Sequence, residues 1–157
     1  MGSQSDYSVM KDCEKILRIL KIKHQVSIVS AHRTPKRMFE FAESAAKNGF
    51  AVIIAGAGGA AHLRGMVASL ATVPVIGVPI ESKKLKGLDS LLSIVQMPKG
   101  CPTATMAING AFNAGLHAAS IIGTFDLKVR SNLEKWKRLQ TKSVKKKLNN
   151  NKCQTLL

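Results

Sequence analysis

A histidine and an arginine stand side by side in the segment Ser30-Ala31-His32-Arg33-Thr34-Pro35. An imidazole can carry a proton near neutral pH, and a guanidinium can hold a phosphate through two parallel hydrogen bonds. Pro35 suits the first turn of a helix, whose N-terminus favours negative charge. The segment therefore predicts an anion site that includes a proton carrier. The alternative is a helix cap whose charged neighbours have no part in chemistry.

A second cluster, Ser3, Ser5 and Asp6, precedes a predicted helix. Hydroxyl groups and free N–H groups at a helix start suit a phosphate, whereas the Asp6 carboxylate suits the hydroxyls of a ribose. The spacing Ser3-x-x-Asp6 also matches a helix cap with a carboxylate in the first turn. The cluster is therefore either a ligand site or a helix cap alone.

A loop of glycines and alanines, 55–65, follows the apolar run 51–54 and contains one imidazole, His62. Glycine lets a backbone approach a ligand closely. Such a loop offers backbone N–H groups, here around Gly58 and Ala60, and can form a cradle or lid at the carboxyl end of a parallel strand. The alternative is a flexible turn that happens to be rich in glycine.

These three loops lie between elements that alternate along the chain. Short apolar runs predict strands at 26–29, 51–54 and 73–78. Apolar periodicity predicts helices at 9–20, 35–46, 66–70, 88–95 and 106–122. This order is typical of βαβ units and a parallel sheet, in which ligands bind beyond the carboxyl ends of the strands. All three loops fall at those ends, so we expect them to form one site.

The net charge of +15 would suit a nucleic-acid-binding protein. Its distribution argues against that class, because ten of the 24 lysines and arginines fall after position 127 and the rest are scattered. Aromatic residues make up 4% of the chain, so platforms for base stacking are few. Nucleic-acid binding through the basic C-terminal part is the least favoured alternative.

No apolar run reaches the ~18 residues of a membrane-spanning helix, and the first six residues lack the features of a signal peptide. The three cysteines, Cys13, Cys101 and Cys153, lack metal-ligand spacing and fit free thiols in a reducing cytoplasm. No motif for a metal hydrolase, a P-loop or a nucleophile elbow occurs. We therefore expect a cytoplasmic protein that binds no membrane and uses no metal or ATP.

Four segments resemble, in the same order, the motifs of one enzyme family: Met1–Asp6, Ser30–Pro35, Gly56–Leu63 and Gly87–Pro98. The family is the class I 5-(carboxyamino)imidazole ribonucleotide mutases of bacterial purine biosynthesis. The similarity runs from Met1 to about Ile122, and four ordered motifs are far more specific than any one of them. Related animal-type carboxylases usually carry lysine at the position of Arg33, so Arg33 favours the mutases.

This resemblance implies a carboxylate transfer from the exocyclic nitrogen of a ribonucleotide to ring carbon C4, with no cofactor. CO2 leaves the nitrogen, is held in the site, and is recaptured by the ring. His32 matches the histidine that shuttles protons, and Ser3, Asp6 and Arg33 match ligands of the ribose phosphate. The loop through His62 matches the segment that closes over the imidazole. We expect further substrate contacts from Ser5, Ser30, Gly58 and Ala60, and a homo-octamer as the assembly.

The resemblance also implies a three-layer flavodoxin-like α/β fold with a parallel sheet. Only Met1 precedes the loop at 2–6, so the first strand is expected to be missing or truncated; the alternative is that the true start lies upstream of Met1. We expect an α/β mutase domain over 1–125, a basic C-terminal helix of the same domain over 126–148, and a disordered tail over 149–157.

Three departures from the family pattern leave alternatives open. Arg64 replaces a proline in the closing loop, the segment 108–114 is two residues shorter than usual, and the first strand is in question. These departures suit an impaired homologue that binds substrate and barely catalyses. A direct carboxylase that uses dissolved CO2 is the other enzymatic alternative.

Overall fold

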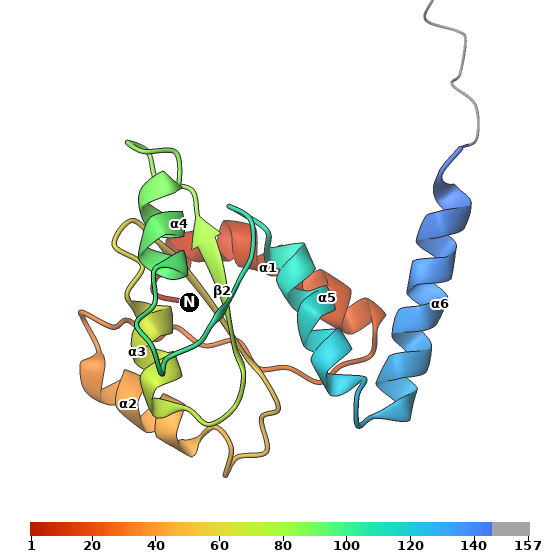
Figure 1. The fold of residues 1–157 in the computed structure, drawn as a ribbon, viewed down its shortest axis with the longest axis horizontal. Helices are drawn as coiled ribbons and strands as arrows, with labels where there is room; N and C mark the ends of the chain where they lie inside the picture. The colour runs from red at the N-terminus through yellow and green to blue at the C-terminus, as the bar shows by residue number, and fades with distance from the viewer. Residues whose placement is uncertain (146–157) are drawn as a thin grey trace, which may run out of the picture.

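A small parallel sheet lies at the centre of the computed structural model, which describes residues 1–145 (Figure 1). Its strands are β1 (Ile53–Gly58), β2 (Val75–Ile80) and β3 (Ala104–Thr105), in the spatial order β1-β2-β3. β1 and β2 pair along their whole length, from Ile53 opposite Val75 to Gly58 opposite Ile80. Both are runs of small or β-branched residues, which suits strands that are covered on both faces.

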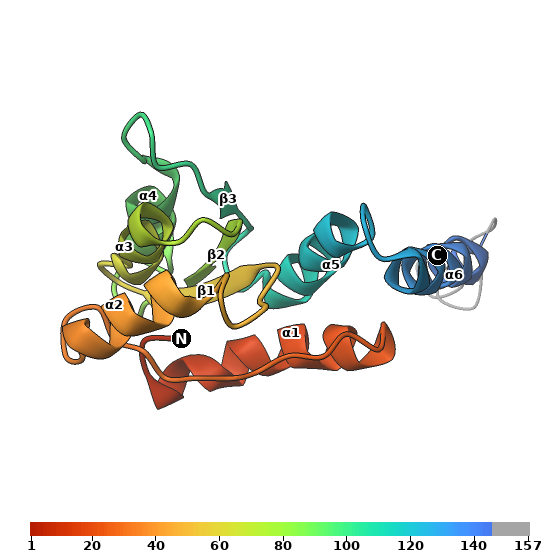
Figure 2. The ribbon, with the colours of Figure 1, turned by 90° about the horizontal axis from the view of Figure 1, so that it is seen from below.

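Helices cover both faces of the sheet and give three layers (Figure 2). One face carries α2 (Pro35–Ser44), α3 (Leu63–Leu70) and α4 (Leu88–Val95). Met38, Val67 and Ile94 anchor these helices in a buried cluster with Ile53 and Val75. The predicted three-layer α/β architecture with a parallel sheet is therefore confirmed.

The other face of the sheet carries the short η1 turn (Gln4–Asp6), α1 (Tyr7–Ile19) and α5 (Ala111–Ile122). Met10 and Leu17 of α1 pack with Ile76 and Val78 of β2 and with Ala114 of α5. The small side chains of α5 let it approach α1 closely. After α1, the chain runs back beside this helix as an extended segment and then enters α2 (Figure 2).

The basic C-terminal helix, α6 (Leu127–Ser143), lies at the end of the molecule away from α2 and α3 (Figure 1). Val129 and Leu133 pack against Leu20 at the end of α1, and Asn132 donates a hydrogen bond to the Leu20 carbonyl at 3.0 Å. The division at residue 126 stays a prediction, and the predicted tail 149–157 lies outside the described residues. None of the helices within residues 1–145 is long and apolar enough to cross a bilayer.

The strand predicted at 26–29 is wrong, because this segment is extended without forming a strand. Sheet pairing needs a neighbouring strand, and the backbone of this segment pairs instead with Met1, whose carbonyl accepts from the Val29 N–H at 2.8 Å. The helix predicted from 106 begins later, at Ala111, because Asn109 adopts a positive φ of 59° that a helix cannot continue.

Candidate functional site

A polar cavity of about 910 Å³ opens at the carboxyl ends of β1 and β2. The three predicted loops all reach it, although only the glycine loop follows a strand of the described sheet, β1. Its walls include the predicted residues Ser3, Ser5, Asp6, Ser30, His32, Arg33, Gly58 and Ala60. His62 is the one predicted site residue that does not line the cavity, but it contacts His32, which does.

The Ser3–Asp6 loop holds its own polar groups in place. The Ser3 N–H donates to Asp6 Oδ2 at 2.9 Å, and Ser3 Oγ accepts from the Ser5 N–H at 3.3 Å. This reciprocal capping box confirms the predicted cap. Burial raises the pKa of the Asp6 carboxyl above its ordinary value, while the hydrogen bond from Ser3 favours the ionised form. Asp6 is therefore both buried and fixed in orientation.

Arg33 links the second loop to the first. Its Nη2 donates to the Gly2 carbonyl at 2.9 Å, and its backbone N–H donates to Ser30 Oγ at 3.3 Å. Thr34 Oγ1 accepts from the Ser30 N–H at 2.9 Å, which closes the turn. Part of the guanidinium thus remains on the cavity wall, between the Ser3 turn and the start of α2.

His32 and His62 form a pair across the mouth of the site. His32 Nε2 lies 2.9 Å from His62 Nδ1, and the rings meet edge to face with centroids 5.1 Å apart. Since a neutral imidazole has one donor and one acceptor nitrogen, one ring donates to the other. Both side chains are exposed, so solvent and ligand can reach them. The pair can hold or pass a proton at the cavity edge.

The glycine loop is tied to the scaffold by a serine that the sequence analysis gave no role. Ser90 of α4 is completely buried, and its Oγ accepts from the Gly59 N–H at 2.8 Å. The same hydroxyl donates to the Ile80 carbonyl at 2.7 Å. The Gly59 N–H is therefore already used and does not face a ligand. Ser90 lies in the motif 87–98 that carries the resemblance, which was the available signal.

The far wall of the cavity holds residues that the sequence analysis missed. Lys83 and Lys86 line it, together with Glu81 and Asn109. Asn109 Oδ1 accepts from the Glu81 N–H at 3.0 Å, and Asn109 Nδ2 donates to Glu81 Oε2 at 3.1 Å. The loop after β2 was the signal for these residues, because it too follows the carboxyl end of a strand. The shortened segment 108–114 thus places Asn109 at the site.

Arg64 does not lie in the closing loop or on the cavity wall. It belongs to the first turn of α3, and its side chain is fully buried. Its Nη2 donates to the carbonyls of Ser93 and Ile94 at the end of α4, while Nε and Nη1 have no partner within the described residues. Burial lowers the pKa of Arg64 to about 10. The prediction that Arg64 adds a charge to the closing loop is therefore wrong, because its side chain lies in the interior of the protein.

Comparisons with known proteins agree on one group. The family model described as AIR carboxylase matches residues 1–143. The chain is 54% identical over 146 residues to the N5-carboxyaminoimidazole ribonucleotide mutase of Escherichia coli, covering 92% of this chain and 86% of that protein. It is 59% identical over 133 residues to the enzyme of that name from Mycobacterium leprae, covering 85% and 78%.

A solved structure supports the same fold. Treponema denticola PurE superposes with a TM-score of 0.82 at 25% sequence identity, over 90% of this chain and 89% of that one. The flavodoxin-like arrangement predicted from the four motifs is therefore confirmed.

Proposed function

The chain belongs to the AIR carboxylase family, and we propose that it moves the carboxylate of 5-(carboxyamino)imidazole ribonucleotide from the exocyclic nitrogen to C4. The product is 4-carboxy-5-aminoimidazole ribonucleotide, an intermediate of purine biosynthesis. The protein is an isomerase of the mutase type. Identities of 54% and 59% to mutases over most of the chain support this activity.

The His32–His62 pair is the observation on which the mechanism rests. The carbamate C–N bond breaks, CO2 leaves, and the exocyclic nitrogen gains a proton. A C–C bond then forms at C4, and the C4 proton is lost. One proton is delivered and one is taken back, so a single group that does both, His32, suffices. His62 Nδ1 can stabilise both protonation states of His32: it can accept a hydrogen bond from a protonated Nε2, or donate one to an unprotonated Nε2.

The remaining site residues are proposed to bind different parts of the substrate. We assign the phosphate to Arg33, Ser3, Ser5 and Ser30, because a guanidinium and hydroxyls meet there. We assign the ribose hydroxyls to the Asp6 carboxylate, which the hydrogen bond from the Ser3 N–H holds in place. Lys83 and Lys86 add positive charge on the opposite wall.

The CO2 that is set free must be kept from water, and one part of the cavity suits it. Ala57, Gly58 and Ala60 line the wall near the histidines. These groups offer little competing hydrogen bonding, and a small-residue loop can close tightly over a ligand. This loop, which also carries His62, is the proposed cover of the imidazole ring.

The assay is turnover of 5-(carboxyamino)imidazole ribonucleotide by the purified protein without ATP or metal, read against spontaneous decarboxylation. We expect product at rates that scale with enzyme. The matched control supplies aminoimidazole ribonucleotide and bicarbonate instead. Turnover of that second pair alone would make the protein a carboxylase, and turnover of neither would support an impaired homologue.

A homo-octamer in the cytoplasm is the proposed assembly and compartment. Three apolar side chains of α4 repeat at steps of three and four, and each is at least half exposed, as is Leu85 in the preceding turn: Leu88, Leu92 and Val95. A stripe of this kind marks an interface. Light scattering of the purified protein should give eight copies, and Leu92→Glu should reduce that number. A monomer at micromolar concentration would contradict the assembly.

A further inference from the structure

The ladder of hydrogen bonds between β1 and β2 changes at its last step, next to the polar cavity. The Ile53 N–H donates at 3.0 Å to the carbonyl of Pro74, the residue before its partner in the register. In a parallel pair, every second residue of one strand repeats this bond. Since Gly58 lies opposite Ile80, the next such bond beyond β1 would join the Gly59 N–H directly to the Ile80 carbonyl.

A side-chain hydroxyl takes the place of this backbone bond. Ser90 Oγ accepts from the Gly59 N–H at 2.8 Å and donates to the Ile80 carbonyl at 2.7 Å. A direct bond would hold the two backbone groups ~2.9 Å apart, whereas an inserted oxygen needs room for two bonds in sequence. Because Ser90 is completely buried in the first turn of α4, its hydroxyl holds the ends of β1 and β2 apart.

The loops that follow the two strands form walls of the polar cavity. Gly59 lines it after β1, and Glu81 and Ser82 line it after β2. The second loop is also fixed to the first turn of α4, because Ser82 Oγ donates to Asp89 Oδ1 at 2.7 Å. The Ser90 N–H donates to the same carboxylate oxygen at 2.9 Å. The first turn of α4 therefore determines how far apart the two loops stand.

The position of Gly59 in turn determines where His62 lies. Gly59 adopts a φ of 67°, in the left-handed region, and the His62 N–H donates to the Ala60 carbonyl at 2.8 Å. This tight turn connects the hydrogen bond at Ser90 to the imidazole whose Nδ1 lies 2.9 Å from His32 Nε2. A shift of Gly59 would therefore separate the two histidines.

The arrangement of the strands predicts the direction of such a shift. The Gly2 N–H donates to the Gly56 carbonyl at 3.3 Å, on the edge of β1 that faces away from β2. The Gly2 carbonyl accepts from Arg33, next to His32, at 2.9 Å, so His32 lies on that side of β1. Without the hydroxyl, the glycine loop can bond directly to the end of β2, and it is then drawn away from His32.

We propose that Ser90 is a positioning residue for the carboxylate transfer: its hydroxyl, inserted between β1 and β2, keeps the glycine loop where His62 meets His32 and where the loop covers the released CO2. This role rests on the proposed function. Ser90 is not part of the cavity wall, so it acts through Gly59 and not on the substrate.

The test measures how the purified full chain divides 5-(carboxyamino)imidazole ribonucleotide between two products. In Ser90→Ala, the carbamate C–N bond still breaks and the exocyclic nitrogen still takes its proton, but CO2 escapes and aminoimidazole ribonucleotide is released. We expect kcat for the carboxylated product to fall by up to ~10²-fold, and enzyme-dependent release of aminoimidazole ribonucleotide to rise. KM should stay close to the wild-type value, because the Arg33 side of the cavity is unchanged.

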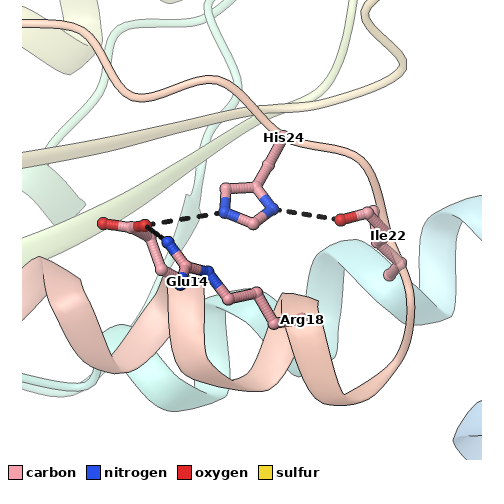
Figure 3. Close-up of polar contacts among 4 residues, drawn as sticks. All are labelled: Glu14, Arg18, Ile22 and His24. Atoms are coloured by element: carbon pink, nitrogen blue, oxygen red, sulfur yellow. Dashed lines mark hydrogen bonds and ion pairs between the residues drawn. The ribbon is translucent and has the colours of Figure 1, made fainter.

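Two matched variants separate the hydroxyl from a general loss of stability. Ser90→Thr keeps a hydroxyl and should restore the wild-type product ratio. Glu14→Gln disrupts a polar cluster on α1, across the sheet from α4, in which Glu14 Oε2 lies 2.8 Å from Arg18 and 3.6 Å from His24 (Figure 3). It should leave the product ratio unchanged. Equal release of CO2 by Glu14→Gln and Ser90→Ala, or a wild-type ratio in Ser90→Ala, would overturn the role of Ser90.

A measurement without substrate distinguishes this role from the proposed function. The ring nitrogens of His32 and His62 are observed by ¹⁵N NMR in the wild type and the three variants. We expect their shifts to change in Ser90→Ala and to stay in Ser90→Thr and Glu14→Gln, because only the first variant separates the rings. If the wild type turns over no substrate while these shifts change as expected, the function fails and the positioning of His62 by Ser90 stands. Unchanged shifts in Ser90→Ala would overturn that positioning even if the enzyme is active.

Discussion

The polar cavity and a second hollow, of about 530 Å³ beside β1 and called the slot below, meet at the first two residues, since Gly2 lines the cavity and Met1 lines the slot. In the cavity, polar side chains hold one another in place, as Ser3 holds Asp6 and Ser30 holds Arg33. In the slot, apolar side chains such as Leu17 and Val67 share the walls with Cys13 and with the polar side chains of Glu14, His24 and Ser27. The cavity therefore suits a small charged ligand, whereas the walls of the slot are of mixed character.

The two hollows also differ in which segments of the chain form them. The cavity collects the loops that follow β1 and β2, which a parallel sheet brings to one edge, together with the turns at 2–6 and 30–34. The slot depends on two edges that are far apart in sequence, 25–29 and 52–56, and on the two residues that bridge them. The first can be expected from sequence order, whereas the second exists only in the assembled sheet.

The largest expected effect belongs to the cavity. His32→Asn keeps a polar side chain but cannot shuttle a proton, so kcat should fall by ~10²–10⁴-fold. The thermal midpoint should barely move, since His32 is exposed. His117→Asn, an exposed histidine of α5 outside both hollows, is the control. Unchanged turnover of the His32 variant would remove the assignment of His32 as the proton shuttle.

The slot should show the next largest effect, on the reactivity of a thiol. Burial raises the pKa of Cys13 to about 12 from an ordinary 9.0, so its thiolate should be ~10³-fold rarer than that of a free cysteine. With Cys101 and Cys153 replaced by serine, iodoacetamide labelling should be correspondingly slow. The rate should still rise about tenfold per pH unit between pH 9 and 11, because the group titrates above that range. A plateau near pH 9 would mean that the slot is open to water.

Arg33 tests the ligand side of the cavity. Arg33→Lys keeps the charge and loses the planar fork, so KM should rise by ~10–100-fold through weaker hydrogen bonds to an anion. The value of kcat should change much less than in the His32 variant. Arg37→Lys, an exposed neighbour on α2 that does not line the cavity, serves as control. Equal KM values in the two variants would show that Arg33 does not hold the phosphate.

The smallest effect is expected at Arg64, whose substitution should change the stability of the protein and not its activity. The pKa of Arg64 is lowered because burial disfavours the charged form, so below pH 10 the ionised side chain costs free energy. Arg64→Met should raise the free energy of unfolding by ~1–3 kcal/mol and leave kcat unchanged. Arg18→Met, an exposed arginine of α1, should change stability by less than ~1 kcal/mol. A destabilised Arg64 variant would show that its bonds to α4 outweigh its desolvation.

Much of the candidate site could be predicted because local chemistry and strand order point the same way. Ser3, Asp6, His32 and Arg33 follow turn and cap signals, and the structure brings all four to one cavity. Lys86 and Asn109 were missed because exposed lysines and asparagines are common in loops. Ser90 was missed because a serine inside an apolar helix gives no sign of its partners, Gly59 and Ile80.

By itself, the sequence determined the layers and the parallel sheet, and it predicted His32 as the proton shuttle, because periodicity and short motifs are local properties. Only the tertiary structure decided that His62 meets His32 and that Arg64 turns inward over Gly77. It also decided that 26–29 is extended without being a strand, since pairing depends on a neighbour and not on the residues themselves.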